Sequence, residues 1–264
     1  MSEVMTQVPD VARLFAERAL DACASYWERG ATEMWLGQPL FRIAGTTHDQ
    51  LVPDGVSNPY WEVIRQMPST DERRWQGVTP YGYEPNLGIG RNGVVSTYSW
   101  SIPSPGDIAW ITDVLAGRGV VEVGAGSGYW AWQLAQAGTD VVAYEPNEVA
   151  DNKFVDVIEP YHPLLRGDAS AAGKHPDRAL FMSWPNYAEP WATHALTAYQ
   201  GDLLIYVGET HGGCCGDDDF FDLLDAEWDE IGDSPHHRTW WGINCRLIAY
   251  RRKQSAAVQG GEGA

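Results

Sequence analysis

The pattern of apolar and polar positions changes most sharply in the segment that begins at residue 120. An apolar run containing three valines gives way to evenly spaced glycines and then to Trp130, Leu134 and Ala135, which recur at helical spacing. A continuous β-branched run is typical of a parallel strand buried on both faces, and glycines let the backbone turn with positive φ close to a ligand. The segment therefore predicts a strand, a tight turn and a helix in direct succession.

The chain beyond this segment repeats the alternation of apolar runs and helical patterns. Further strands are predicted at residues 139–146, 161–169, 177–187 and 201–209. Helices are predicted at residues 104–115, 152–158, 191–199 and 217–231, the last with Phe220, Leu224, Trp228 and Ile231 as its buried stripe. Residues 238–241 and 245–251 are separated by a glycine-containing turn and predict a closing hairpin. This alternation is typical of an α/β domain with a mostly parallel sheet.

The N-terminal part has a different pattern. Asp10 is placed to cap a helix ending near Gly30, with one face made by Val11, Leu14, Phe15, Ala19, Ala22 and Tyr26. Residues 45–105 are rich in Pro, Gly, Tyr and Trp and show little periodicity apart from a short helical stretch at residues 59–67. Long segments of this kind are usually lids or binding segments. We therefore expect a helical and loop-rich cap at residues 1–104, a cofactor domain at 105–253 and a polar, disordered tail at 254–264.

The glycine spacing separates two classes of nucleotide cofactor. A dinucleotide site needs G-x-G-x-x-G, but Gly124, Gly126 and Gly128 are evenly spaced, and Tyr129 stands where the third dinucleotide glycine belongs. The acidic Glu122 also lies inside the preceding strand. This run resembles the first motif of class I S-adenosylmethionine-dependent methyltransferases.

The resemblance implies a set of cofactor contacts. In that family the residue matching Glu122 holds the ammonium of the methionine end, and the turn matching Gly124, Ala125, Gly126 and Gly128 passes beneath the cofactor. The implied fold is a Rossmann-like, seven-stranded, mostly parallel sheet whose last strand is antiparallel. The resemblance covers residues 104–252.

A second acidic residue ends the next apolar run. Glu145, followed by Pro146, lies about twenty residues beyond the glycine turn. A carboxylate at this position can accept hydrogen bonds from both ribose hydroxyls. The alternative is an exposed glutamate at the end of a strand. Further along, Asp168 and Ala169 match the family position that meets the adenine amino group, although a helix cap explains this Gly-Asp-Ala turn equally well.

Two further segments are expected near the cofactor. Trp100 and Tyr98 lie in the approach segment that covers the cofactor in the resembling family. Ser183 ends the predicted fourth strand, and the loop from Ser183 to Tyr187 loosely resembles the Asn-Pro-Pro-Tyr loop of some amino-group methyltransferases, with only Pro185 aligned. An ordinary proline-containing strand exit is the alternative. Tyr98 and Tyr187 are the candidate polar side chains near the methyl group.

His211 follows the predicted fifth strand directly and is the candidate general base, because an imidazole titrates near neutral pH. A solvent-exposed turn histidine is the alternative. The neighbouring Cys214 and Cys215 are adjacent and cannot readily reproduce the C-x-x-C chelate of a zinc site, so no metal is expected.

Composition narrows the range of substrates. The 36 acidic and 18 basic residues give a formal net charge of -18, which disfavours nucleic acid and anionic membranes as partners. The sequence has 13 Trp. Aromatic residues of the cap, which suit a planar or apolar ligand but also fill cores, are Trp61, Trp75, Tyr81, Tyr83, Tyr98 and Trp100.

No signal-peptide pattern or transmembrane run is found, and a cytoplasmic protein with free thiols is expected.

These observations predict an S-adenosylmethionine-dependent methyltransferase of specialised metabolism that acts on a small aromatic or apolar molecule. Two alternatives remain open. An enzyme of the same fold can use the sulfonium cofactor for ring closure, and a non-catalytic module can bind the cofactor for a partner protein. The acceptor atom and the oligomeric state are not indicated by the sequence.

Overall fold

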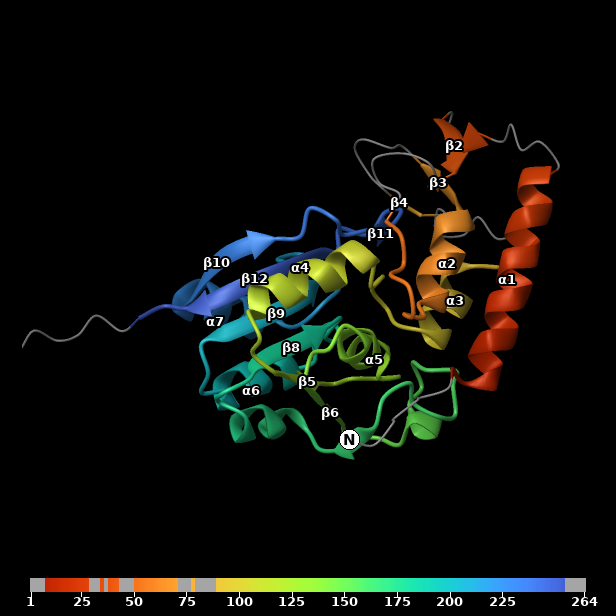
Figure 1. Ribbon diagram of the computed structural model, residues 1–264. Coiled ribbons are helices and arrows are strands. Elements are labelled where there is room, and N and C mark those ends of the chain that lie inside the picture. The colour runs from red at the N-terminus through yellow and green to blue at the C-terminus, as the bar shows by residue number, and fades with distance from the viewer. Residues whose placement is uncertain are drawn as a thin grey trace, which may run out of the picture.

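The computed structural model describes residues 8–28, 34–35, 38–42, 50–70, 77–78 and 89–254, with side chains described for 8–28, 50–68 and 89–254. Figure 1 shows a sheet domain formed by the C-terminal part of the chain and a cap of N-terminal helices and short strands beside it. Trp75, Tyr81, Tyr83 and residues 255–264, including nearly all of the expected tail, lie outside the described residues.

The sheet domain is built on seven strands in the order β10-β12-β9-β8-β5-β6-β7. Their bounds are Val120–Val123 (β5), Val141–Glu145 (β6), Leu164–Arg166 (β7), Ala179–Ser183 (β8), Leu203–Gly208 (β9), Trp228–Asp233 (β10) and Arg246–Arg252 (β12). The pairs from β7 to β9 are parallel, whereas β12 runs antiparallel to both β9 and β10. The prediction of a Rossmann-like, mostly parallel seven-stranded sheet with an antiparallel last strand is confirmed.

Helices cover both faces of this sheet. On one face, α4 (Pro105–Leu115) and α5 (Tyr129–Gln136) pack against β5, β8 and β9. On the other, α6 (Trp191–Ala198), α7 (Asp218–Glu227) and the 3₁₀ helix η2 (Ala169–Lys174) form a second core. Along β5, Val120 joins the first core and Val121 the second, as the alternation of side chains in a strand requires. The apolar run is therefore continuous because both faces are buried.

Local signals placed several helix ends correctly. Ser104 caps α4 by accepting a hydrogen bond from the Asp107 amide at 3.1 Å, with Pro105 at the first helical position. Asp217 caps α7 by accepting from the Phe220 amide at 3.1 Å. The helix expected at residues 152–158 is wrong, because only a 3₁₀ turn, η1 (Val149–Asp151), precedes that segment.

The last strands differ from the prediction. The helical stripe expected through Trp228 and Ile231 ends at Glu227, and the following residues form β10, an edge strand in which Ile231 is 46% exposed. The predicted hairpin is wrong, because β11 (Thr239–Trp240) pairs with β4 of the cap while β12 pairs with β10 and β9.

A buried polar network accounts for the departure of this connection from the sheet. Asp107 at the start of α4 accepts a hydrogen bond from the Ser234 hydroxyl at 2.6 Å and contacts His237 Nδ1 at 2.8 Å. These contacts hold the chain beyond β10 against α4, so that β11 continues into the cap.

The cap contains more regular structure than expected. Its helices are α1 (Asp10–Glu28), α2 (Pro59–Gln66) and α3 (Arg91–Thr97). Its described strands are β1 (Met34–Trp35), β2 (Gln38–Arg42), β3 (Pro68–Thr70) and β4 (Gly77–Val78), which form a five-stranded sheet with β11. The short helix at residues 59–67 is confirmed. Because β11 lies within residues 105–253, the sheet of the cap also uses a strand from the part of the chain expected to form the cofactor domain.

The buried face of α1 is rotated from the predicted one. Val11 and Leu14 are 46% and 51% exposed, and the buried face consists of Ala12, Ala16, Ala19, Cys23 and Tyr26. Small side chains let α1 approach α2 closely, and Trp27 Nε1 donates to the Gln66 carbonyl at 2.7 Å.

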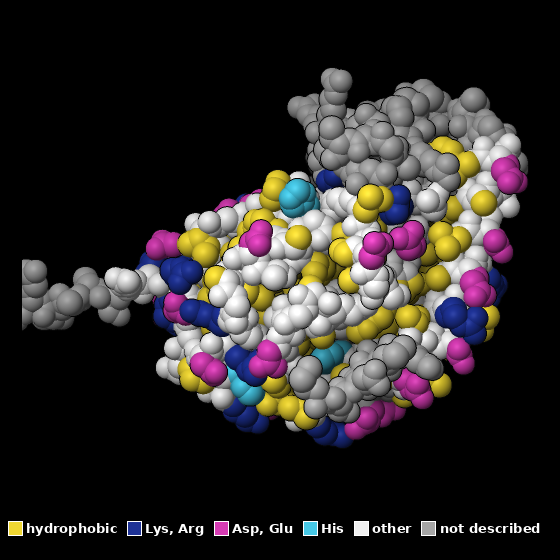
Figure 2. All heavy atoms as spheres, in the orientation of Figure 1, with side chains coloured by type: hydrophobic (Ala, Val, Ile, Leu, Met, Phe, Trp, Pro, Cys, Tyr) yellow, Lys and Arg dark blue, Asp and Glu magenta, His cyan; other side chains and the backbone are white. Residues whose placement is uncertain are grey.

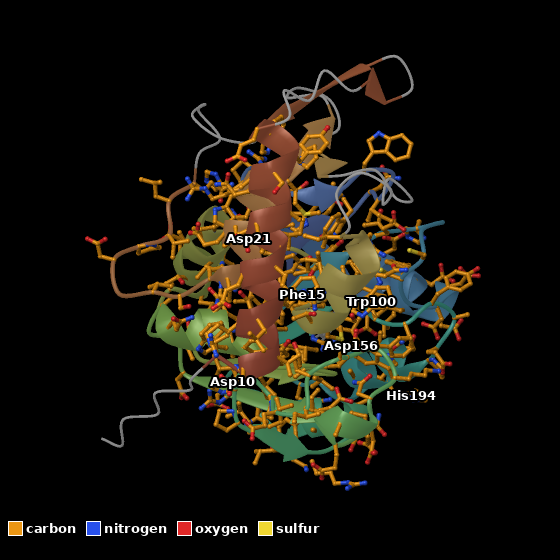
Figure 3. All side chains as sticks on the ribbon, turned by 90° about the vertical axis from the view of Figure 1, so that its right-hand side faces the viewer. Asp10, Phe15, Asp21, Trp100, Asp156 and His194 are labelled. Atoms are coloured by element: carbon orange, nitrogen blue, oxygen red, sulfur yellow. The ribbon has the colours of Figure 1, made fainter. Side chains whose placement is uncertain are left out.

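In Figure 3, Asp10 and Asp21 lie along α1, with Trp100, Asp156 and His194 to its right. Acidic side chains gather along α1 at the right edge of Figure 2.

Aromatic rings join the cap to the cofactor domain. The rings of Tyr60 and Tyr98 are stacked with centroids 5.1 Å apart, and both meet Tyr129 of α5 edge to face. The Tyr129 hydroxyl donates to Asn58 Oδ1 at 2.8 Å and accepts from the Tyr60 amide at 3.0 Å. These cap aromatics therefore fill the interface between the two parts.

Candidate active site

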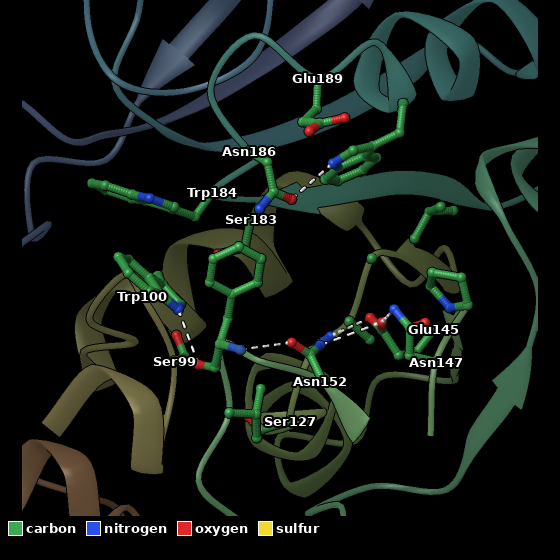
Figure 4. A pocket seen from close by; sticks show the side chains of 18 of the residues that line it. Ser99, Trp100, Ser127, Glu145, Asn147, Asn152, Ser183, Trp184, Asn186 and Glu189 are labelled. Atoms are coloured by element: carbon green, nitrogen blue, oxygen red, sulfur yellow. Dashed lines mark hydrogen bonds between the residues drawn. The ribbon is translucent and has the colours of Figure 1, made fainter. Parts of the chain in front are cut away.

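A cavity of about 1160 Å³ lies beyond the carboxyl ends of β5, β6 and β8 (Figure 4). Ligands bind in this position in open α/β sheets. The volume exceeds the usual range of about 300–1,000 Å³ for small-molecule sites, so the cavity has room for two bound molecules. It is lined by the predicted site residues Tyr98, Trp100, Glu122, Gly124, Ala125, Gly126, Glu145, Pro146, Asp168, Ala169, Ser183 and Tyr187.

The glycine turn uses its glycines in different ways. Gly124, Gly126 and Gly128 all have positive φ, at 73°, 58° and 75°. A Cβ on Gly124 would lie 2.8 Å from the Trp191 ring, whereas one on Gly126 would meet nothing closer than 3.9 Å. Gly126 therefore leaves open space above its backbone, as a ligand requires.

Gly128 departs from the prediction because it is not among the residues that line the cavity. It begins α5, and a Cβ there would lie 3.2 Å from Leu164 and 3.3 Å from the His162 amide nitrogen. The lack of a side chain at Gly128 lets α5 start close against the segment that contains His162 and Leu164. A direct contact between Gly128 and a ligand is not supported.

Glu122 lines the cavity from inside β5. Its side chain is 1% exposed, and Oε2 is buried without a hydrogen-bond partner among the described residues. Burial, with a smaller contribution from the charge of Glu145, raises the pKa of Glu122 to about 8. A buried carboxylate without a partner is costly, so this position suits a ligand that brings a cation or hydrogen-bond donors.

Glu145, at the end of β6, faces the same cavity and is tied to the glycine turn. Its Oε2 accepts from the Gly126 amide at 2.9 Å, and its Oε1 accepts from Asn152 Nδ2 at 3.4 Å and from Asn147 Nδ2 at 3.5 Å (Figure 4). The alternative of an exposed strand-end glutamate is wrong, because the residue is buried. Burial raises the pKa of Glu145.

Asp168 is a helix cap, as one of its two interpretations predicts, and its place at the cavity leaves the other open. It caps η2, with Oδ1 accepting from the Ser170 amide at 2.9 Å and from the Ser170 hydroxyl at 2.6 Å, and it also lines the cavity. The hydrogen bonds from Ser170 lower the pKa of Asp168, so it presents an ionised acceptor to the cavity.

The two candidate catalytic tyrosines, Tyr98 and Tyr187, have different environments in the structure, and Ser183 lies at the end of a strand. Tyr98 is buried, and its hydroxyl donates to the Ala12 carbonyl of α1 at 3.2 Å, so it is not available to a ligand. Tyr187 lines the cavity and is 69% exposed. Ser183 Oγ lies 2.8 Å from Ser101 Oγ at the end of β8. Of the two tyrosines, only Tyr187 keeps a hydroxyl that could reach a bound molecule.

His211 does not line the cavity, so the structure does not support the prediction that it is the general base. Its ring is about half exposed, with Nε2 3.1 Å from Asp225 Oδ2 of α7. The backbone beyond β9 turns at Thr210–Gly213 and carries the ring toward α7, over Phe221 at a centroid distance of 4.9 Å. The alternative, a solvent-exposed turn histidine, describes it correctly.

Several cavity residues were not anticipated from the sequence. Asn147 and Asn152 follow Glu145 closely, and their amides next to a candidate ribose ligand were the available signal. Trp191, at the start of α6, forms a wall and donates from Nε1 to Asn186 Oδ1 at 3.0 Å. Arg91, far upstream, gave no signal because its position depends on how the cap folds back over the sheet.

Neither a metal site nor a membrane-spanning helix is found within the part of the chain that the structure describes. No group of three or more His, Cys, Asp or Glu side chains there could hold a metal ion. No helix there combines the length and the apolar character needed to cross a bilayer.

No protein-family model matches the sequence, and no curated protein matches it. Among solved structures, magnesium protoporphyrin IX methyltransferase (ChlM) from Synechocystis PCC 6803 with bound SAM is similar at 18% identity, covering 56% of this chain and 80% of that chain, with a TM-score of 0.36. TehB from Haemophilus influenzae is similar at 13% identity, covering 62% and 68%, with a TM-score of 0.39. The glycopeptide N-methyltransferase MtfA complexed with S-adenosyl-L-homocysteine is similar at 11% identity, covering 56% and 89%, with a TM-score of 0.37.

Proposed function

From the premise that this chain has the fold of class I S-adenosylmethionine-dependent methyltransferases, we propose that it binds S-adenosylmethionine and transfers the methyl group to a small molecule. The observation that carries the proposal is Glu122, a buried side chain beside the glycine turn that follows β5. One of its carboxyl oxygens has no hydrogen-bond partner among the described residues. An ammonium group is the complement that such an oxygen lacks.

The lining residues fit the rest of this cofactor. Glu145 would accept hydrogen bonds from the ribose hydroxyls, Asp168 would accept from the adenine amino group, and the open backbone at Gly126 would lie beneath the cofactor. When bound, the cofactor supplies a methyl group on a positively charged sulfur. The carboxylates that line the cavity favour such a cation; they belong to Glu122, Glu145, Asp151, Asp168 and Glu189.

The aromatic walls suit an acceptor that is itself aromatic or apolar. Trp100, Phe154, Trp184 and Trp191 line the cavity, and such walls exclude water and hold a planar molecule in one orientation. Methyl transfer depends mainly on holding the acceptor close to the methyl carbon in a dry site. We propose that Tyr187 positions the acceptor and that the reaction belongs to specialised metabolism; the net charge of -18 argues against a nucleic-acid substrate.

A calorimetric titration tests the cofactor. S-adenosylhomocysteine should bind to the full chain with one site, and NAD should give no heat. The evenly spaced glycines and the buried Glu122 support the former ligand, since a dinucleotide pyrophosphate would meet a carboxylate. Binding of NAD without binding of S-adenosylhomocysteine would overturn the proposal.

A second experiment tests the reaction. The protein is incubated with methyl-labelled S-adenosylmethionine and a metabolite extract, and the label is followed by mass. Label on a small molecule supports methyl transfer. Label on protein or RNA would overturn the substrate class, cofactor turnover without label transfer would indicate ring closure, and binding without turnover would indicate a non-catalytic module.

His211→Ala should leave both assays nearly unchanged. Exposed substitutions away from a site usually change free energies by no more than about 0.5 kcal/mol, so the rate of label transfer should stay within about twofold of the wild type. The affinity for S-adenosylhomocysteine in the titration should also be retained. A fall in rate of about 100-fold or more is the size expected for loss of a general base. Such a result would show that His211 takes part in catalysis.

A further inference from the structure

Arg91 is a buried cation that lies against two neighbouring tryptophan rings at the cavity. It is the first residue of α3 and is 8% exposed. Its Cζ lies 5.3 Å from the ring centroid of Trp100 and 5.6 Å from that of Trp184, and all three residues line the cavity. The two rings are 6.3 Å apart and inclined by 31°. This packing uses the faces of the rings and fixes where the guanidinium stands.

The hydrogen-bonding edge of Arg91 is not satisfied by the described part of the chain. Its Nε is buried without a hydrogen-bond partner, although a guanidinium offers five donors. The carboxylate of Glu209 interacts electrostatically with Arg91, but its oxygens already accept hydrogen bonds from the Cys214 amide at 2.8 Å and the Asn244 amide at 2.6 Å. Burial opposes ionisation of Glu209, yet the contacts from Cys214 and Asn244, with the charge of Arg91, lower its pKa. Leaving a buried cation without acceptors is costly.

The charge pattern of the cavity sets Arg91 apart. The described lining residues include five carboxylates and two cations, Arg91 and Lys153, and Lys153 is exposed with Nζ 4.9 Å over the Phe154 ring. Trp100 and Trp184, the rings that hold Arg91, lie on one side of the cavity, and Glu145 and Asn147 lie on the other (Figure 4). The cavity is therefore acidic where the cofactor is proposed and has one buried cation at the other side.

We propose that Arg91 binds a carboxylate of the methyl acceptor, so that the substrate is a small organic acid with an aromatic or apolar body. A planar guanidinium pairs with a carboxylate through two parallel hydrogen bonds. Because its ring contacts leave its edge free, Arg91 can form this pair without leaving the two tryptophans. This proposal rests on the proposed function, since it names the second molecule of the same cavity.

The test uses the full chain saturated with S-adenosylhomocysteine. The probes are indole-3-acetate and 4-hydroxybenzoate, each paired with its neutral amide, indole-3-acetamide and 4-hydroxybenzamide. Calorimetry should show binding of at least one acid, with its amide at least about tenfold weaker, as loss of a charge-assisted contact predicts. In the labelled extract, the methylated product should be retained on an anion exchanger.

Variants show whether Arg91 is responsible. Arg91→Gln should weaken binding of the acid by about 10- to 100-fold, and Arg91→Lys, which keeps the charge but not the fork, should restore part of it. Arg13→Gln is the matched control, because Arg13 is an exposed arginine on α1 paired with Asp10 and Glu17. All variants should keep their affinity for S-adenosylhomocysteine, which also reports that they are folded.

The outcomes separate this proposal from the proposed function. If S-adenosylhomocysteine binds but neither acid binds better than its amide, or if Arg91→Gln binds the acid as tightly as the wild type, Arg91 is a structural residue and the proposal fails. A neutral or cationic labelled product would overturn it as well. Failure to bind S-adenosylhomocysteine would instead overturn the proposed function.

Discussion

Glu122→Gln should stabilise the cofactor-free protein at alkaline pH while weakening its affinity for S-adenosylhomocysteine. Burial raises the pKa of Glu122 to about 8 in the folded chain, from its ordinary value of 4.5. Between these pH values the folded state holds a proton that the unfolded state has lost. The free energy of unfolding therefore falls as the pH rises through this interval, by about 1.4 kcal/mol per pH unit for one proton, and the loss is complete above about pH 8.

Glutamine keeps the shape of the side chain and removes this ionisation. Urea unfolding of the two proteins should differ little at pH 5, and the advantage of Glu122→Gln should grow to about 4 kcal/mol at pH 8.5. In calorimetry at pH 7 the same variant should bind S-adenosylhomocysteine at least about tenfold more weakly, because the ammonium loses its charged partner. The wild type should release a proton on binding, and the variant should not.

Glu148→Gln is the matched control for this experiment, because Glu148 is an exposed glutamate, with a side chain 73% accessible, on the loop that follows β6. It should change neither the pH dependence of unfolding nor the affinity. A stability difference between wild type and Glu122→Gln that does not grow with pH would show that Glu122 is not buried as a proton-binding carboxylate.

Glu145→Ala should cause the largest loss of cofactor affinity. Two charge-assisted hydrogen bonds to the ribose hydroxyls, each contributing about 1.5–3 kcal/mol, amount to a loss of two to four orders of magnitude. The substitution also removes the acceptor of the Gly126 amide, so the glycine turn loses one of the hydrogen bonds that hold it against β6. Calorimetric titration with S-adenosylhomocysteine measures the effect.

Glu148→Ala, three residues further on, serves as the control and should bind like the wild type. Glu145→Gln should fall between the two, since its amide oxygen can still accept one hydrogen bond. Unchanged affinity in Glu145→Ala would mean that the buried carboxylate only braces the glycine turn.

The sequence by itself determined the centre of the fold. The strand, glycine turn and helix that begin at residue 120 and the capped start of α4 at Ser104 came from signals that span only a few residues. Glu145 came from its place at the end of the next apolar run, about twenty residues beyond the glycine turn. β-Branched runs, positive-φ glycines and capping side chains act through neighbouring backbone, so their meaning does not depend on distant parts of the chain.

Only the tertiary structure decided which side chains meet. Trp228 and Ile231 continue a helical pattern but belong to β10, where Trp228 pairs with Arg252 of β12 and Ile231 lies at the irregularity between the paired residues Glu230 and Gly232. The Tyr98 hydroxyl donates a hydrogen bond to α1, and the His211 ring contacts Asp225 of α7. Arg91 lines the cavity because the cap folds over the sheet and places it against the rings of Trp100 and Trp184. Each of these contacts joins residues whose proximity depends on the packing of whole elements, and no local periodicity records that packing.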